Sequence, residues 1–186
     1  YFIFGLSPAQ MGAALSMISG MELGTPGKSH TNDQIYNTST THHAFIMIFF
    51  MVMPFMIGGF GNSLVPHTFS APDMAFPRTH NMSFSLLPPS MHFLLLSNII
   101  GSGVGTDSTL YPPLSSESHH NTPSVDLSRF ALHIAGTSSI MGAITLIVTI
   151  LNMHSSTSTL NFIPLSQSSV LITAILLLLS LPVLAG

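Results

Sequence analysis

Long stretches without a charged side chain dominate the sequence. Three Lys and Arg residues and six Asp and Glu residues occupy short segments, and four uncharged stretches lie between them: Tyr1–Met21, Gln34–Pro72, Thr79–Thr106 and Phe130–Gly186. A membrane-spanning helix needs about 20 mostly apolar residues, and a charge at the bilayer centre costs roughly 2.5–3.5 kcal/mol. The pattern therefore predicts five helical spans, near Phe2–Ser19, His42–Pro66, Met82–Ile100, Val125–Met153 and Pro164–Gly186.

The predicted connectors are short and rich in turn-forming residues. They cover Gly20–Tyr36, His67–Asn81, Gly101–Pro123 and the Ser- and Thr-rich segment Met153–Asn161. Glycine, proline and asparagine favour turns, and short connections favour antiparallel neighbours. We therefore expect an all-α, polytopic transmembrane bundle. Three cationic side chains are too few to set its orientation by the positive-inside rule.

Composition excludes several classes of protein. Charged residues make up 5% of the chain, against about 25% in soluble globular domains, and the mean hydropathy is +0.56. These values exclude an ordinary soluble enzyme, a disordered segment and a nucleic-acid-binding protein. The absence of cysteine excludes disulfides, thiolate metal sites and a thiol nucleophile. Neither a Gly-rich phosphate loop nor a G-x-S-x-G or H-E-x-x-H motif occurs.

Two spans contain helix-breaking or small residues. Pro54 and the cluster Gly58, Gly59 and Gly61 interrupt the second span, and small residues recur every four positions in the fourth span, at Ala135, Ser139 and Ala143. Membranes tolerate such breaks where neighbouring helices satisfy the freed backbone groups, and small faces allow close helix contact. Tight packing explains both features without a function.

Histidines provide the stronger chemical signal. Of the ten, His42 and His43 open the second span, and His92 and His133 lie within the third and fourth. A neutral imidazole binds iron, copper or zinc through one nitrogen while the other donates a hydrogen bond, but it also serves as a hydrogen-bonding group between helices. Consecutive residues on a helix point about 100° apart, so we expect one of His42 and His43 to face the bundle interior. Residue chemistry alone leaves both roles open.

Several motifs are similar to those of subunit I of the haem–copper oxidases, in particular the cytochrome c oxidases. The matching segments include THHAFIMIFFMVMPFMIGGFGN, APDMAFPR, NMSFSLLPPS and LITAILLLLSLPVLAG, which begin at Thr41, Ala71, Asn81 and Leu171. The register holds from Tyr1 to Gly186. The resemblance implies one partial subunit I domain over 1–186, from within the first helix into the fifth helix of a twelve-helix core. Tyr1 and Gly186 each lie inside an apolar run, in keeping with a partial sequence.

The resemblance implies a respiratory enzyme of the mitochondrial inner membrane. Members take electrons from cytochrome c through copper on subunit II and pass them through a low-spin haem a. A high-spin haem and copper pair then reduces dioxygen to water with proton pumping. Subunits II and III and membrane lipid are the implied partners, and nucleic acid is not one. A quinol-oxidising relative and a non-catalytic split-gene or pseudogene fragment are the alternatives; a transporter or channel would explain the helices but not the motifs.

The resemblance also assigns cofactor-binding roles. His43 matches the axial ligand of the low-spin haem iron, and His42 stands where the family has a small residue, so we interpret it as an oddity near the membrane surface. Tyr36 matches a tyrosine that hydrogen-bonds the tail of this haem, whereas Gly20 replaces an arginine near its formyl group. Glu22 and the backbone of Gly27 match a site for calcium or sodium, ions that prefer oxygen ligands.

A proton-entry path is implied by six further positions. Asp73 matches the entry carboxylate, and Asn62, Ser138 and Ser139 match polar residues of the path. His80 and Thr145 replace asparagines of the family. Both side chains can still form hydrogen bonds, but we expect a charge on His80 to disturb a water chain.

Catalytic residues are expected to be absent from this segment. In the family, the copper ligands, the high-spin haem ligand and the second low-spin haem ligand come from later helices.

The chain also lacks tryptophan. Serine stands at four positions where the family has tryptophan: Ser63, Ser85, Ser108 and Ser168. Truncating one buried tryptophan typically costs about 3–5 kcal/mol. We therefore hypothesise that the gene was read with the wrong genetic code, that its transcript was not edited, or that it is a decayed copy.

Overall fold

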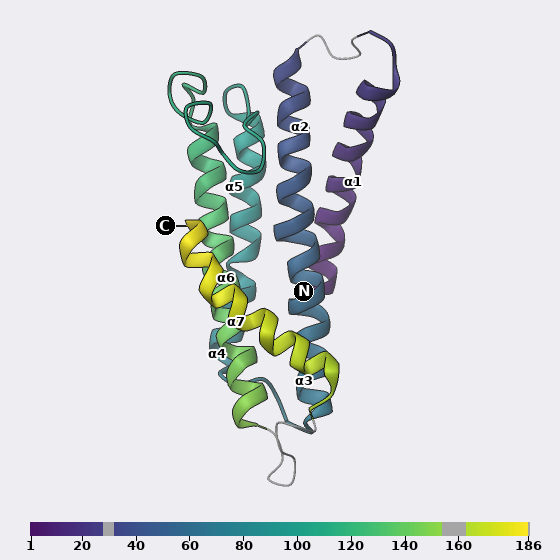
Figure 1. The fold of residues 1–186 in the computed structure, drawn as a ribbon, viewed down its shortest axis with the longest axis vertical. Coiled ribbons are helices and arrows are strands. Elements are labelled where there is room, and N and C mark those ends of the chain that lie inside the picture. The colour runs from purple at the N-terminus through teal and green to yellow at the C-terminus, as the bar shows by residue number, and fades with distance from the viewer. Residues whose placement is uncertain (28–31, 154–162, 186) are drawn as a thin grey trace. The chain divides into compact units, whose positions relative to one another are not determined.

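The computed structural model describes residues 1–27, 32–153 and 163–185. Within these ranges the chain forms helices and no strand, which confirms the predicted all-α class (Figure 1). The elements are α1 (Phe2–Gly24), α2 (Asp33–Phe45), the π-helices η1 (Ile46–Val52) and η2 (Pro54–Gly61), α3 (Asn62–Thr68), α4 (Pro77–Ser85), α5 (Leu87–Ile99), α6 (Ser124–Asn152) and α7 (Leu165–Ala185). Of the predicted connector Met153–Asn161, all but Met153 lies outside the described residues.

Four helical stretches in the described ranges are long and apolar enough to cross a membrane. They are Phe2–Gly24, Asp33–Thr68, Ser124–Asn152 and Leu165–Leu184, and they overlap four of the five predicted spans. The stretch predicted as one span near Met82–Ile100 is instead divided, because α4 ends at Ser85 and α5 begins at Leu87. Pro88 and Pro89 follow this break. Proline is tolerated in the first turn of a helix but not in its interior, so a new helix starts here.

The predicted interruption of the second span takes the form of a wider helix. From Ile46 to Gly61 the backbone winds as two π-helices, η1 and η2, and the helical run ends only at Thr68. Pro54 has no N–H and cannot make the hydrogen bond that an α-helix requires at its position. A π-helix bonds residues five apart, and such segments often occur near functional sites.

Contacts within the chain divide it into two compact units. Unit 1 contains Tyr1–Phe2, Met53–Pro88 and His133–Gly186, and unit 2 contains Ile3–Val52 and Pro89–Leu132. The helical run that starts with α2 and the long helix α6 each contribute to both units.

Unit 2 packs α1, α2 and η1 with α5 and the beginning of α6. Its buried apolar side chains include Phe45, Phe50 and Leu94. Serine hydroxyls join neighbouring helices, because Ser39 donates to the carbonyl of Leu15 at 3.2 Å and Ser90 donates to that of Ala131. Such short polar side chains allow close helix contact in apolar surroundings.

Unit 1 is built around an apolar cluster between α3, α6 and α7. Its buried members are Val65, Met74, Ala143, Leu146, Ile150 and Ala174. The predicted small face of α6 belongs here, since Ala135 and Ala143 are buried and the Ser139 hydroxyl donates to the Ala135 carbonyl at 3.0 Å. A Cβ atom at Gly59 would lie 2.6 Å from Cε1 of Phe2, so this ring requires glycine on η2.

Candidate functional site

The sequence-predicted residues fall into two groups that follow the two units. Those assigned to a haem or a cation, namely Glu22, Gly27, Tyr36 and His43, belong to unit 2. Those assigned to a proton path, namely Asn62, Asp73, His80, Ser138, Ser139 and Thr145, belong to unit 1.

The hydrogen bond that His43 makes to α1 uses only one of its two ring nitrogens. The residue lies in the last turns of α2 and is half-buried. Its Nδ1 is 2.7 Å from the carbonyl oxygen of Gly12 on α1, and because a carbonyl only accepts, Nδ1 carries the proton. The lone pair of the neutral ring is then on Nε2. This is the arrangement in which an imidazole binds a metal while its other nitrogen is fixed by a hydrogen bond.

His42 differs from the sequence-based interpretation as an oddity near the membrane surface. Its side chain is 0% exposed, inside unit 2. Nδ1 lies 2.9 Å from the carbonyl of Thr38, and Nε2 lies 3.0 Å from the hydroxyl of Ser97 on α5. Both ring nitrogens are therefore occupied, which excludes His42 as a metal ligand in this arrangement. Of the two histidines, His42 is the fully buried one and His43 is half-buried.

Tyr36, Glu22 and Gly27 line one cavity. It measures about 390 Å³ and lies at the end of α1 and the start of α2, where Asn32, Asp33 and Asn37 also contribute. Tyr36 is half-buried and precedes His43 by seven residues, two helical turns or about 10.5 Å along the same face of α2. The sequence analysis did not assign Asp33 to the cation site. The available signal was its carboxylate, which lies in the same predicted connector, Gly20–Tyr36, as Glu22.

The cavity fits a hard cation only in part. Carboxylate and backbone oxygens are suitable donors for calcium or sodium, and Gly27 has φ +101°, a conformation that turns the backbone sharply. Among the described residues, however, no group of three or more His, Asp or Glu side chains is arranged to hold a metal ion. A cation here would need backbone carbonyls, water or ligands from elsewhere.

Asp73 lies in the connector between α3 and α4, and His80 lies in the first turns of α4. Asp73 is exposed, and its Oδ1 accepts a hydrogen bond from the backbone N–H of Met74 at 2.7 Å. Burial lowers the pKa of His80 below its ordinary 6.5, and this effect outweighs the negative charge of Asp73, which raises it. His80 is therefore predominantly neutral at neutral pH. Its Nδ1 is buried without a hydrogen-bond partner among the described residues.

A hydrogen-bonded cluster in unit 1 includes two residues that the sequence did not single out. The Tyr1 hydroxyl is 3.1 Å from the Ser83 hydroxyl, which donates to the Ser138 carbonyl at 2.7 Å. The Ser138 hydroxyl donates in return to the Ser83 carbonyl. The ring of Tyr1 also lies beside that of His80, with centroids 5.9 Å apart. The available signal was the spacing of three residues between His80 and Ser83, which places both on one face of α4.

The other predicted path residues have local partners or none. The Thr145 hydroxyl is buried and donates to the Gly142 carbonyl at 2.8 Å, whereas Ser139 bonds its own helix. Oδ1 of Asn62 is buried and has no partner in the described part of the chain. A buried polar atom without a partner is costly unless water reaches it, so Asn62 and His80 mark positions suited to water.

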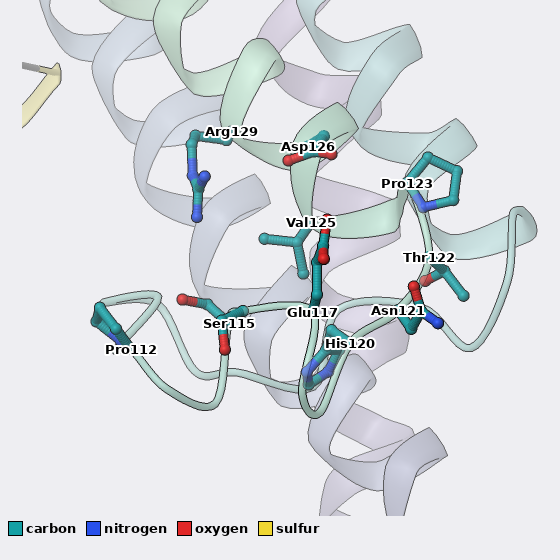
Figure 2. A pocket seen from close by; sticks show the side chains of 11 residues that line it. Pro112, Ser115, Glu117, His120, Asn121, Thr122, Pro123, Val125, Asp126 and Arg129 are labelled. Carbon is teal, nitrogen blue, oxygen red and sulfur yellow. The ribbon is translucent and has the colours of Figure 1, made fainter.

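A further cavity of about 630 Å³ lies under the connector between α5 and α6. Figure 2 shows Glu117 and His120 on this connector, with Asp126 and Arg129 on the first turns of α6. His120 is buried, with Nδ1 2.6 Å from the Leu114 carbonyl and Nε2 3.1 Å from the amide nitrogen of Gln34. The sequence analysis assigned no role to this histidine. The structure instead gives it a role in holding the connector together.

The remaining sequence-level expectations concern exposed positions. His92 and His133 are exposed. The serines that replace family tryptophans lie at or near the surface: Ser63, Ser85 and Ser108 are exposed, and Ser168 is half-buried. The hydroxyl of Ser63 donates to the Gly59 carbonyl at 2.8 Å. None of these four serines is fully buried within this chain.

Comparison with known proteins gives a consistent result. A profile of the family described as "Cytochrome C and Quinol oxidase polypeptide I" matches residues 1–186. Over 188 aligned residues, which include all of this chain, the chain is 48% identical to cytochrome c oxidase subunit 1 of Eremothecium gossypii, 49% to that of Yarrowia lipolytica and 48% to that of Candida albicans. The chain spans about a third of the length of these relatives, 35% in each case. It belongs to the family of cytochrome c and quinol oxidase polypeptide I.

Proposed function

We propose that this chain forms part of the core subunit of a cytochrome c oxidase, where it supplies one axial ligand of the low-spin haem and the proton-entry region. The whole enzyme would take electrons from cytochrome c and reduce dioxygen to water with proton pumping, in the mitochondrial inner membrane. Subunits II and III would be its neighbours. The observation that carries the proposal is the hydrogen bond from His43 Nδ1 to the Gly12 carbonyl, which leaves Nε2 available to iron.

The haem would bind on the side of unit 2 where His43 presents Nε2. When bound, a low-spin haem a would supply one-electron transfer. His43 would hold the iron through Nε2, and the Gly12 carbonyl would keep the ring in one tautomer and orientation. Tyr36, on the same face of α2, would donate its phenolic proton to the haem tail. By resemblance to the family, the second axial ligand, the high-spin haem ligand and the copper ligands would come from later helices of the subunit.

Unit 1 supplies groups that suit proton uptake. The exposed carboxylate of Asp73 can collect protons from solvent, and a proton then needs donors and acceptors that water can link. Asn62 and His80 provide buried atoms without protein partners, and the hydroxyls of Tyr1, Ser83 and Ser138 provide a hydrogen-bonded cluster. Ser139 and Thr145 lie further along α6. Because burial keeps His80 neutral, its ring can accept and donate hydrogen bonds as the asparagine of the family does, contrary to the expectation that its charge would disturb a water chain.

A cation is the second ligand proposed for this chain, besides the haem. Glu22 and the Gly27 backbone would bind calcium or sodium in the cavity that they share with Tyr36. The negative charge of the Glu22 carboxylate would be balanced there, and the ion would join the end of α1 to the start of α2.

Two alternatives predict different observations. A quinol-oxidising relative belongs to the same family, but the relatives that match this chain carry the name cytochrome c oxidase, which favours the cytochrome c type. A non-catalytic fragment from a split or decayed gene would have the same fold without assembling into an active complex.

Replacement of His43 tests the proposal. In an oxidase that contains this chain, His43→Ala is expected to abolish the absorbance of the low-spin haem, because the iron loses an axial ligand. His92→Ala is the matched control, since His92 is an exposed histidine of α5. An unchanged low-spin spectrum in the His43 variant would reject the assignment.

A further inference from the structure

Two consecutive histidines connect α2 to different neighbours within unit 2. His43 bonds the Gly12 carbonyl of α1 through Nδ1, and His42 bonds the Ser97 hydroxyl of α5 through Nε2. Successive side chains on a helix point about 100° apart. The two rings therefore hold α2 from two directions, and a rotation of α2 about its axis would break at least one of these hydrogen bonds.

The contacts of His42 are complete for a neutral ring. Its Nδ1 carries the proton, because the Thr38 carbonyl at 2.9 Å can only accept. Nε2 is then an acceptor, and the hydroxyl of Ser97 is at donor distance, 3.0 Å. The same hydroxyl is 2.6 Å from the Leu94 carbonyl of its own helix, an alternative acceptor for its single proton. When the Ser97 proton is directed to Nε2 instead, both ring nitrogens of a neutral His42 are hydrogen-bonded.

The contact between His42 and Ser97 is buried, so its loss would not be compensated by water. His42, Thr41 and Ser97 are each 0% exposed, so water cannot replace a lost partner. Thr41, the residue before His42, also fixes this turn, since its hydroxyl accepts from the backbone N–H of Asp107 at 3.0 Å. Three successive residues of α2 therefore contact three different segments of unit 2. The turn that carries His43 has its orientation set by residues that do not themselves contact a haem.

We propose that His42 is a positioning residue, which fixes the rotation of α2 through Ser97 and thereby directs Nε2 of His43 at the iron. The proposal rests on the proposed role of His43 as a haem ligand. It differs from a purely structural role in its consequence: loss of the His42 contact changes the geometry of the iron ligand, and not only the stability of the fold.

The test compares variants in an oxidase that contains this chain, with the electron paramagnetic resonance signal and the midpoint potential of the low-spin haem as readouts. His42→Ala is expected to retain the haem but to shift its g-values and its potential. Ser97→Ala removes only the partner on α5 and is expected to shift both in the same direction. His42→Gln keeps a polar group of similar reach and is expected to restore the original signal in part. His92→Ala is the control that is expected to have no effect, because His92 is an exposed residue of α5.

The outcomes separate this proposal from the proposed function. If His43→Ala removes the low-spin signal while His42→Ala and Ser97→Ala leave it unchanged, the positioning role is rejected and the ligand role stands. If His43→Ala leaves the signal unchanged, the ligand assignment itself fails. Should His42→Ala fail to assemble, the Ser97→Ala complex still decides, because an unchanged signal there contradicts the proposal and a shifted one supports it. Reduced yield with an unshifted signal in every variant would indicate packing alone.

Discussion

Replacing Gly12 by alanine tests how closely α1 approaches the helical run that carries His43. A Cβ atom at Gly12 would lie 2.7 Å from Cγ of Met47 and nearer still to its sulfur, so the Met47 side chain would have to move. Overpacking of this kind typically costs about 1–3 kcal/mol. Alanine is favoured over glycine inside a helix by about 0.5–1 kcal/mol, which offsets part of this loss. We expect a net loss of roughly 0–2.5 kcal/mol in the free energy of unfolding.

Gly20→Ala provides the matched control on the same helix. Nothing lies within 4 Å of a Cβ atom at Gly20, so this variant should gain only the helix preference of alanine. Because that gain is common to both, the two variants should differ by the overpacking cost alone, about 1–3 kcal/mol. Denaturant unfolding of the chain in detergent micelles, followed by far-UV circular dichroism, measures both values. A Gly12→Ala chain as stable as the Gly20→Ala chain would refute the close packing of α1 against Met47.

Two further variants each replace one ionisable residue, His80 in α4 and Glu22 near the end of α1. The pKa of His80 is lower in the folded chain than its ordinary 6.5, so the unfolded chain binds the proton more readily and the free energy of unfolding should decrease as the pH falls below 6.5. His80→Asn should abolish this decrease, and denaturant unfolding at several pH values would contradict the reasoning if the two chains showed the same pH dependence. Glu22→Gln should weaken calcium binding by about tenfold, equivalent to about 1.4 kcal/mol. Isothermal titration calorimetry measures the affinity for calcium. Glu117→Gln is the matched control, because Glu117 lines a different cavity. Equal calcium affinities in the two variants would count against the Glu22 site.

Charge distribution was sufficient to predict most of the helices. Apolar length and the absence of charge are properties of each segment alone, so they locate α1, α6 and α7 without knowledge of their neighbours. The same criterion missed the break at Leu86, because the residues on both sides are uncharged. Pro88 and Pro89 carried the missing information, since proline favours the first turn of a new helix over the interior of an old one.

The winding of the second span could not be predicted in the same way. Pro54 and the glycines after it indicated a departure from regular α-helix, but not which one. The rings of Tyr1 and Phe2 pack against Gly58 and Gly59, and this contact depends on residues more than fifty positions away. Local sequence does not contain that information.

For the candidate site, the sequence could not predict which side chains are hydrogen-bond partners. The family motif assigns the ligand role to His43, which in the structure uses only Nδ1 for its hydrogen bond to the Gly12 carbonyl. The burial of His42 was missed, because it depends on Ser97, a residue 55 positions later in the chain. Tyr1 and Ser83 were missed for the same reason: their contact spans 82 positions and follows from tertiary packing within unit 1.

The most direct test of the account is a structure of an oxidase that contains this chain with its haems bound. The account predicts that Nε2 of His43 lies at bonding distance from the iron of the low-spin haem, with Nδ1 still donating to the Gly12 carbonyl and His42 still on Ser97. A His43 ring that faces lipid, or an iron held by another histidine of this chain, would contradict it.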